Sequence, residues 1–185
     1  MKIVVAIGGA SGAIYARVLL DKLMKMSGHE VSIVMSDNAE INWKLENKDD
    51  SLEKYTFRRF AKNDFNAPFA SGSGKYDAMI ICPCSAGLLG RIANGISDDL
   101  ITRAADVMLK ERKKLVLVFR ETPLNLVHIK NMEKITLAGG IICPAMPSFY
   151  SNSKSIEEIV ATVSYRALEL TGLDTGSFSW GESDS

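Results

Sequence analysis

Five short runs of mostly branched apolar residues alternate along the chain with segments of helical periodicity. The first run, KIVVAI at 2–7, is uninterrupted, which is typical of a strand buried on both faces of a sheet. Four further strands are expected within 30–36, 76–85, 113–121 and 139–146. Strands that alternate with helices predict an α/β protein with a parallel sheet.

Helices are expected in the segments between and after these strands. Their expected ranges are 11–26, 38–46, 51–60, 85–94, 98–112, 124–138 and 155–171. Ser11 is expected to cap the first helix, and the last begins with the capping-box motif Ser155-Ile-Glu-Glu158. A long loop is expected at 63–77, because this segment contains Pro68 and two glycines.

The composition indicates one compact domain. The 185 residues are 46% apolar, and 22 Lys and Arg residues balance 22 Asp and Glu residues. A balanced charge gives no support to nucleic-acid or membrane-surface binding, and no apolar run reaches the roughly 20 residues of a membrane helix. We expect a single domain over 1–172 and a Gly-, Ser- and Asp-rich tail over 173–185 that is available to pack on a neighbouring subunit.

Cysteine and histidine usage points to a reduced protein without a metal site. Cys82, Cys84 and Cys143 are odd in number, and their spacing matches neither a redox pair nor a zinc pair. The two histidines, His29 and His128, lie far apart, so a His-based metal site is not expected. Reduced cysteines suit a cytoplasmic protein.

Hydrogen-bond donors follow four of the five predicted strands. Ser11, Ser36, Ser85 and Arg120 come at or just after the carboxyl ends of successive strands. The carboxyl ends of parallel strands meet at one edge, and α/β proteins bind ligands there. Hydroxyl and guanidinium donors suit phosphate or the polar edge of a heterocycle. The alternative is that Ser36 and Ser85 only cap the helices that follow them.

The first strand runs into Gly8-Gly9-Ala10-Ser11-Gly12, a turn of small residues. Glycines let the backbone approach a ligand closely, and the first amides of the next helix lack an internal partner, so such a turn can bind an anion. The spacing is neither the dinucleotide G-x-G-x-x-G nor a Walker A loop, and Ser36 stands where an acid would hold a ribose. FMN therefore fits this pattern better than NAD. A tight turn without a ligand is the alternative.

Longer motifs make the chain similar to a known family. GASGAIYA, ASGS, CPCSAGLL, RAADVMLKERKKLVLVFRETPL, HIKNM and PSFY resemble, in order and spacing, the flavin prenyltransferases of the UbiX/Pad1 family, formerly called 3-octaprenyl-4-hydroxybenzoate or phenylacrylic acid decarboxylases. The resemblance covers about 2–172 and extends to WGE at 180–182. It implies a flavodoxin-like (Rossmann-type) three-layer fold, one flavoprotein domain, and a homododecamer that works without metal.

The resemblance also implies a reaction. Family members join a dimethylallyl group from dimethylallyl phosphate to N5 and C6 of reduced FMN. The product, prenylated FMN, is the cofactor of a separate UbiD-type decarboxylase. Such a decarboxylase is therefore the expected recipient of the product.

Residues at matching positions take their expected roles from the same resemblance. The FMN-binding positions are Gly9, Ala10, Ser11, Ser36, Ser85, Ala86, Gly87, Leu88 and Arg120. The positions that bind the prenyl phosphate are Tyr150 and Arg166, and others that line the phosphate and flavin pocket are Arg103, Lys110 and Glu121.

Three of the residues are expected to act in catalysis. Glu46 matches a family acid near the flavin ring, and the resemblance implies that it transfers a proton during ring closure. The resemblance also implies that Ser11 lies near N5. Closure onto an aromatic carbon requires loss of a ring proton. A carboxylate such as Glu46 or Glu121 is a natural base for that step.

Several of these residues have other interpretations. Arg103, Asp106 and Lys110 are spaced i, i+3 and i+7 on one predicted helix, which also suits a surface ladder of ion pairs. Arg166 borders an apolar helix face, where an Arg often extends its stem over the surface toward solvent or a partner chain. Tyr150 suits a core tyrosine with a bonded hydroxyl equally well.

Two other functions stay open beside the prenyltransferase. One is a flavin-dependent cysteine decarboxylase of the same broad fold, and the other is an FMN-binding protein without catalysis. The decarboxylases use a catalytic histidine early in the chain, and here only His29 is available. Because Arg103 and Lys110 lie on a different helix from Arg166, we expect a pocket closed by several subunits.

Overall fold

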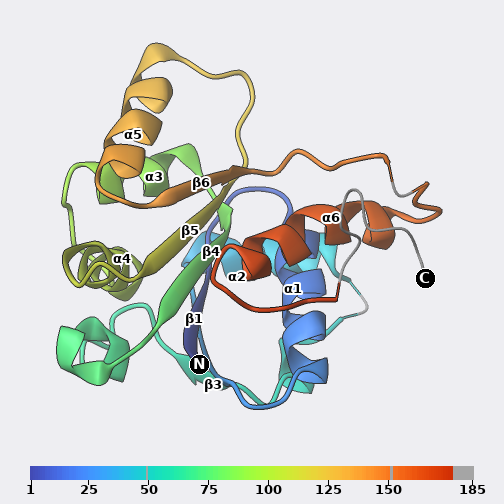
Figure 1. Ribbon diagram of the computed structural model, residues 1–185, viewed down its shortest axis with the longest axis horizontal. Helices are drawn as coiled ribbons and strands as arrows, with labels where there is room; N and C mark the ends of the chain where they lie inside the picture. The colour runs from blue at the N-terminus through green and yellow to red at the C-terminus, as the bar shows by residue number, and fades with distance from the viewer. Residues whose placement is uncertain (49, 151, 177–185) are drawn as a thin grey trace.

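Six parallel strands form one sheet in the computed structural model, which describes residues 1–48, 50–150 and 152–176 (Figure 1). Their order is β3-β2-β1-β4-β5-β6, and every neighbouring pair is parallel. The strands are β1 (Lys2–Ile7), β2 (Glu30–Met35), β3 (Arg58–Phe60), β4 (Ala78–Cys84), β5 (Lys114–Phe119) and β6 (Ile141–Pro144). Apart from the edge strand β3, this is the flavodoxin-like strand order, so the predicted fold class is confirmed.

Six α-helices accompany the strands in the described part of the chain, each within two residues of its expected range. They are α1 (Ala13–Lys25), α2 (Asp37–Glu46), α3 (Ala86–Ala93), α4 (Leu100–Lys110), α5 (Leu126–Leu137) and α6 (Ile156–Glu169). Among these residues, no helix is long and apolar enough to cross a membrane.

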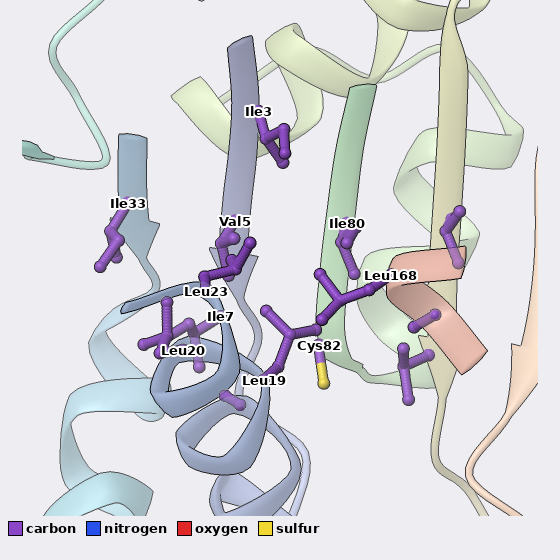
Figure 2. Packing of buried hydrophobic residues seen from close by; sticks show 14 of the residues in the cluster. Ile3, Val5, Ile7, Leu19, Leu20, Leu23, Ile33, Ile80, Cys82 and Leu168 are labelled. Atoms are coloured by element: carbon purple, nitrogen blue, oxygen red, sulfur yellow. The ribbon is translucent and has the colours of Figure 1, made fainter. Parts of the chain in front are cut away.

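The helices cover both faces of the sheet, so the fold has three layers (Figure 1). On one face, Leu19 and Leu23 of α1 and Leu168 of α6 pack against Val5 and Ile80 of the sheet (Figure 2). On the other face, α3, α4 and α5 enclose a second cluster. Alternate residues of each central strand enter one cluster or the other, which explains why these strands are apolar without interruption. Each fully buried aliphatic side chain contributes roughly 1.5–3 kcal/mol.

The segment 51–60 is where the helix prediction is wrong. A 3-10 turn, η1 (Leu52–Lys54), is followed there by β3, which pairs with β2 at the edge of the sheet. Arg58 and Arg59 of β3 are exposed. A three-residue edge strand with two exposed arginines has no apolar run, so a search for hydrophobic periodicity misses it.

The expected loop at 63–77 is confirmed and is partly ordered by two 3-10 turns, η2 (Pro68–Ala70) and η3 (Gly72–Gly74). Phe69 of η2 is fully buried in the second cluster, in edge contact with Phe60 and Tyr76. Burial of this aromatic ring anchors the loop on the face covered by α4.

The C-terminal helix α6 begins at the predicted residue. Ser155 Oγ accepts a hydrogen bond from the Glu158 amide at 3.2 Å, whereas the Glu158 carboxylate accepts from the Lys154 amide instead of the Ser155 amide. Leu173 and Thr175 are buried, so the packed part of the chain continues beyond the end of α6. The remainder of the expected tail, with the WGE motif, lies outside the described residues.

The chain leaves the centre of the sheet in two opposite directions. From β1 it builds β2 and β3 on one side, then returns across β1 to build β4, β5 and β6 on the other. The carboxyl ends of β1 and β4 therefore mark a topological switch point, where open α/β sheets bind ligands. The small-residue turn at 8–12, called the glycine turn below, follows β1 at this point.

Candidate functional site

The carboxyl ends of β2, β1, β4 and β5 are neighbours, and we call this edge of the sheet the rim. The glycine turn, Ser36, Ser85 and Arg120 each follow one of these strands directly. The predicted convergence of these four segments is therefore confirmed. Their contacts with a ligand stay a prediction.

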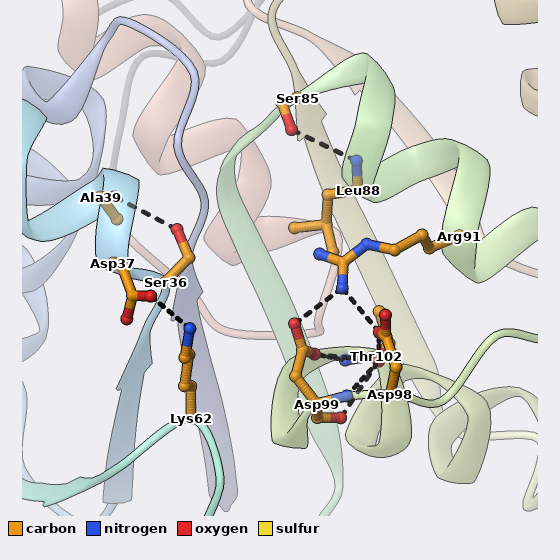
Figure 3. Close-up of polar contacts among 10 residues, drawn as sticks. All are labelled: Ser36, Asp37, Ala39, Lys62, Ser85, Leu88, Arg91, Asp98, Asp99 and Thr102. Atoms are coloured by element: carbon orange, nitrogen blue, oxygen red, sulfur yellow. Dashed lines mark hydrogen bonds and ion pairs between the residues drawn. The ribbon is translucent and has the colours of Figure 1, made fainter.

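Ser36 and Ser85 have the same local role at the rim (Figure 3). Ser36 Oγ accepts the amide of Ala39 at 3.2 Å, and Ser85 Oγ accepts the amide of Leu88 at 3.2 Å. Each serine thus caps the helix that follows it, α2 or α3. A hydroxyl that accepts one bond can still donate its proton to a ligand, and the positive ends of two helix dipoles lie beside these serines.

The glycine turn is held closely between two elements. The Gly8 amide donates to the Pro83 carbonyl at 3.0 Å, and a Cβ on Gly8 would lie only 2.6 Å from that oxygen. A Cβ on Gly9 would lie 2.5 Å from the Cβ of Asn38 in α2. These two glycines are therefore required for the approach of the turn to β4 and α2, and neither leaves space there for a side chain.

The first helix is capped differently from our expectation. Gly12, with φ of 110°, is the N-cap of α1, and no side-chain cap comes from this position, so the prediction of Ser11 as the cap is wrong. Instead, the Glu46 carboxylate accepts the Gly12 amide at 2.8 Å and the Ala13 amide at 2.6 Å. The anion-binding character expected of these amides is real, but the anion is a carboxylate of the same chain.

This contact also explains the position of Glu46. It is the last residue of α2, where its charge is unfavourable against the dipole of its own helix. At the N-terminus of α1 the same charge meets the positive end of a second dipole. The side chain is brought to the rim by α2, near the exposed Ser11.

Asn42 is a rim residue that the sequence reasoning missed. Its Nδ2 donates to the Gly9 carbonyl at 2.9 Å, one helical turn before Glu46. The spacing of Asn38, Asn42 and Glu46 by four residues on a predicted helix was the available signal.

The first turn of α3 is the open part of the rim. A Cβ on Gly87 would meet no atom within 4 Å, in contrast to Gly8 and Gly9. Ala86 is half-buried, whereas the Leu88 side chain is buried beneath the turn, so Leu88 has only its backbone to offer a ligand. These observations show that the start of α3 is exposed beside the rim.

Arg120 and Glu121 follow β5 at the rim and are both half-buried. The Arg120 amide donates to the Cys84 carbonyl at 3.0 Å, which extends the pairing of β5 with β4. The Glu121 carboxylate accepts the Thr122 amide at 3.1 Å. Strand pairing therefore fixes the backbone from which these two side chains extend.

Tyr150 and Arg166 come from the C-terminal part of the chain. Arg166 lines a cavity of about 670 Å³ between β6, the segment after it and α6. Arg166 pairs with Glu169 one turn along α6, at 3.3 Å. Tyr150 is 74% exposed, so its interpretation as a core residue is wrong.

Among the described residues, the order of the elements places Lys110 away from the rim strand ends, and Arg103 bonds to neighbours that are not rim residues. Arg103 pairs with Asp106 at 3.3 Å, as the ion-ladder interpretation predicts, and donates from Nε to the Ala70 carbonyl of η2 at 3.0 Å. Lys110 pairs with Glu111 and ends α4 just before β5 begins, at the opposite edge of the sheet.

The cysteines lie in the core, as expected. Burial raises the pKa of the Cys84 thiol to about 12 and raises that of Cys82 well above its usual range. Both thiols therefore stay protonated near neutral pH and are poor nucleophiles. Within the described ranges, no cluster of His, Cys, Asp and Glu side chains is suited to hold a metal ion.

The strand order and the polar rim at the switch point define a flavodoxin-like α/β protein with a site of mononucleotide type. Comparison with known proteins agrees with this class. Residues 1–168 match the family model described as Flavoprotein. The chain is 40% identical to the flavin prenyltransferase UbiX of Methanocaldococcus jannaschii over 190 residues, which cover 98% of this chain and 99% of that protein.

Solved structures give the same result. The crystal structure of AnUbiX (PadA1) in complex with FMN and dimethylallyl pyrophosphate has a TM-score of 0.91 and 42% identity, over 100% of this chain and 98% of that one. A dodecameric FMN-dependent UbiX-like decarboxylase from Escherichia coli O157:H7 has a TM-score of 0.91 and 38% identity, over 97% and 99% of the two chains. The chain belongs to the flavoprotein family and, within it, to the UbiX flavin prenyltransferases.

Proposed function

We propose that this chain transfers a dimethylallyl group from dimethylallyl phosphate to N5 and C6 of reduced FMN and releases prenylated FMN. The observation that carries this proposal is the likeness, over the whole chain, to a protein crystallised with FMN and dimethylallyl pyrophosphate. The converging strand ends support it independently, because they offer donors for a phosphate and a heterocycle at one edge.

The rim fits FMN as the substrate that is alkylated. The open space over Gly87 and the helix N-termini beside Ser36 and Ser85 suit a phosphate-bearing ligand. In the proposed complex, Gly9, Ala10 and Ser11 line one side of the flavin, and Ser85, Ala86, Gly87 and Leu88 line the other. Arg120 binds the ligand through a charge-assisted hydrogen bond.

FMN itself supplies the nucleophilic atoms N5 and C6. N5 displaces phosphate from the donor and loses its proton. The double bond of the N5-bound group then gains a proton at one carbon, its tertiary carbon bonds to C6, and C6 loses its proton. Glu46 is proposed to move a proton in this closure, with Ser11 near N5 and Glu121 as a second carboxylate at the rim. The amides of Gly12 and Ala13 hold the Glu46 carboxylate in place for this work.

The leaving phosphate needs cationic and hydroxyl donors. We assign this work to Arg166 and Tyr150 together with Arg103 and Lys110. Arg gives planar, bidentate recognition of phosphate oxygens. Because Lys110 lies at the edge of the sheet opposite the rim, we infer that Arg103 and Lys110 serve the site of a neighbouring copy.

We propose that the chain forms a homo-oligomer, namely a dodecamer. Exposed apolar side chains support this proposal. Large apolar side chains are exposed on and near α5, in the segment after β6 and at the start of α6, and clusters of such side chains mark protein–protein contacts. They are Leu124, Leu126, Val127, Ile129, Leu137, Met146, Phe149 and Ile156. We further propose a cytoplasmic protein whose product passes to a UbiD-type decarboxylase.

One experiment tests the reaction. The purified protein is mixed without oxygen with FMN, a reductant and dimethylallyl phosphate, and the extracted flavin is weighed by mass spectrometry. A flavin heavier by one C5 unit is the expected result. Unchanged flavin from a folded protein, with either the monophosphate or the diphosphate donor, would contradict the proposal.

The cysteine decarboxylase alternative is disfavoured by the fold. Its catalytic histidine would have to reach the rim. His29, the only histidine in the first half of the chain, lies just before β2, at the opposite edge of the sheet.

A further inference from the structure

The face of α2 that meets the glycine turn carries three side chains spaced by four residues. Asn38, Asn42 and Glu46 follow one another along one face of the helix. The Asn38 Cβ closes against Gly9, Asn42 Nδ2 donates to the Gly9 carbonyl at 2.9 Å, and Glu46 caps α1. We call these three side chains the α2 clamp.

Other contacts also fix α2 to the protein. Ala39 and Trp43 are buried, Trp43 Nε1 donates to the Asp50 carbonyl at 2.8 Å, and Asp37 pairs with Lys62. Neither of these two polar contacts involves the glycine turn. The polar contacts of the α2 clamp are therefore the ones that join α2 to the glycine turn directly.

We propose that Asn42 is a positioning residue for the transfer reaction. By holding the Gly9 carbonyl, it fixes α2 against the glycine turn and so aims the Glu46 carboxylate, which stands one turn further along the same helix. This inference rests on the proposed function, in which Glu46 moves a proton during ring closure. Misplacement of a reacting group by about 1 Å can reduce a rate as much as a hundredfold.

The side-chain chemistry of Asn42 suits this task. The carboxamide is a neutral donor of the same reach as an aspartate, whose ionised carboxylate can only accept and would face the Gly9 carbonyl. Asp in place of Asn therefore converts an attraction into a repulsion with almost no change in shape. Gln keeps the donor on a stem that is longer by one methylene.

The test compares Asn42→Ala, Asn42→Asp and Asn42→Gln with the control Lys44→Ala, an exposed change on the same helix. Single-turnover mass spectrometry follows alkylation at N5, which adds the C5 unit. Ring closure leaves the mass unchanged, so it is followed by loss of the C6 proton signal in the NMR spectrum of the extracted flavin. We expect about tenfold slower closure in Asn42→Ala, a larger loss in Asn42→Asp, and recovery of at least half the rate in Asn42→Gln. Alkylation at N5 should change by less than threefold, and Lys44→Ala should match the wild type.

A purely structural role predicts another pattern. If alkylation and closure fall together, in proportion to a lower melting temperature, the positioning role of Asn42 is refuted. It is equally refuted if Asn42→Asp behaves like Asn42→Ala, or if neither variant slows closure.

Hydrogen exchange separates failure of this inference from failure of the proposed function. If the wild type does not prenylate FMN, the proposed function falls. Even then, the rate of amide hydrogen exchange in a peptide that spans 8–16 reports whether the hydrogen bond of Asn42 to Gly9 stabilises the glycine turn. Faster exchange there in Asn42→Ala, but not in Lys44→Ala, supports that hold. Unchanged exchange overturns it.

Discussion

The two halves of the candidate site differ in how much of each a single chain completes. The flavin half consists of the glycine turn, the α2 clamp and the first turn of α3, which the strand order brings to one rim. The donor half consists of Arg103, Lys110, Tyr150 and Arg166, which come from two separate regions. This difference supports the proposal that one chain builds the nucleotide site, whereas the proposed phosphate-leaving site depends on assembly.

The first prediction concerns the cations of the donor half. Arg166→Ala and Lys110→Ala should each lower kcat/KM for the prenyl donor about 100-fold, because each removes a donor aimed at developing phosphate charge. FMN affinity should change by less than about threefold, because the flavin half stays intact. Steady-state kinetics and an FMN titration measure the two quantities, with Lys25→Ala, an exposed change on α1, as the control.

Co-assembly of the two variants sharpens this prediction. If Arg166 and Lys110 reach one site from different copies, mixed oligomers contain some sites with both residues intact. Co-expressed Arg166→Ala and Lys110→Ala chains should then regain activity well above either variant alone. An oligomer shown to contain both chains but without recovery would mean that one copy supplies both residues to each site.

The next effect concerns the carboxylate of the flavin half. Glu46→Gln removes the proton acceptor and leaves one oxygen for the two amides of Gly12 and Ala13. We expect FMN to bind while ring closure slows by about 10² to 10⁴, so that flavin alkylated only at N5 accumulates and keeps its C6 proton signal in the NMR spectrum. Glu40→Gln, an exposed acid on the same helix, is the control and should turn over normally. Full turnover by Glu46→Gln would remove Glu46 from the mechanism.

Sequence patterns predicted the flavin half better than the donor half for a physical reason. Buried parallel strands are recognisable as apolar runs, and their carboxyl ends must share an edge, so Ser36, Ser85 and Arg120 could be expected together. Residues on helices carry no such constraint. Nothing in the spacing of Lys110 and Arg166 reveals which copy of the chain each one faces.

The errors within the flavin half also have physical causes. Ser11 has the side chain of a helix cap, but Gly12 has a positive φ that glycine adopts without strain, and a long-range carboxylate supplies the cap. Long-range contacts such as Asn42 with Gly9 depend on tertiary structure that local preferences do not contain. The strand β3, outside the flavin half, was missed because it is held by backbone pairing with β2 and has no apolar run that a sequence pattern could reveal.

Two glycines of the flavin half should respond oppositely to the same substitution. Gly8→Ala places a Cβ 2.6 Å from the Pro83 carbonyl, and backbone must move, so we expect a loss of about 1–3 kcal/mol of unfolding free energy. Gly87→Ala meets no atom within 4 Å and should leave stability unchanged or raise it by up to about 1 kcal/mol. Chemical denaturation of both variants measures the difference.

The affinity of Gly87→Ala for FMN tests whether the flavin lies beside this glycine. Because Gly87 borders the open space over α3, its alanine variant should bind FMN more weakly despite its undiminished stability. Unaltered FMN affinity in Gly87→Ala would place the flavin elsewhere on the rim.

The smallest expected effect is on the pH dependence of stability, and it concerns an ion pair outside the rim. Arg91 of α3 pairs there with Asp99, the N-cap of α4, at 2.8 Å (Figure 3). Burial opposes the ionised form of Asp99, but hydrogen bonds from Thr102 and Arg91 outweigh it and lower the pKa of Asp99. A carboxylate with a lowered folded-state pKa adds stability that is complete above the unfolded-state pKa of about 3.9 and is lost as the pH falls through the folded-state value.

Asp99→Asn tests this pH dependence, because Asn still caps a helix but does not titrate. Between pH 5 and pH 3, the wild type should lose about 1 kcal/mol more unfolding free energy than the variant, measured by denaturant titration. Near neutral pH, FMN affinity should be the same in both proteins, since neither Arg91 nor Asp99 belongs to the rim. Parallel pH curves would mean that this ion pair does not stabilise the fold, and altered FMN affinity would mean that the flavin half depends on the junction of α3 with α4.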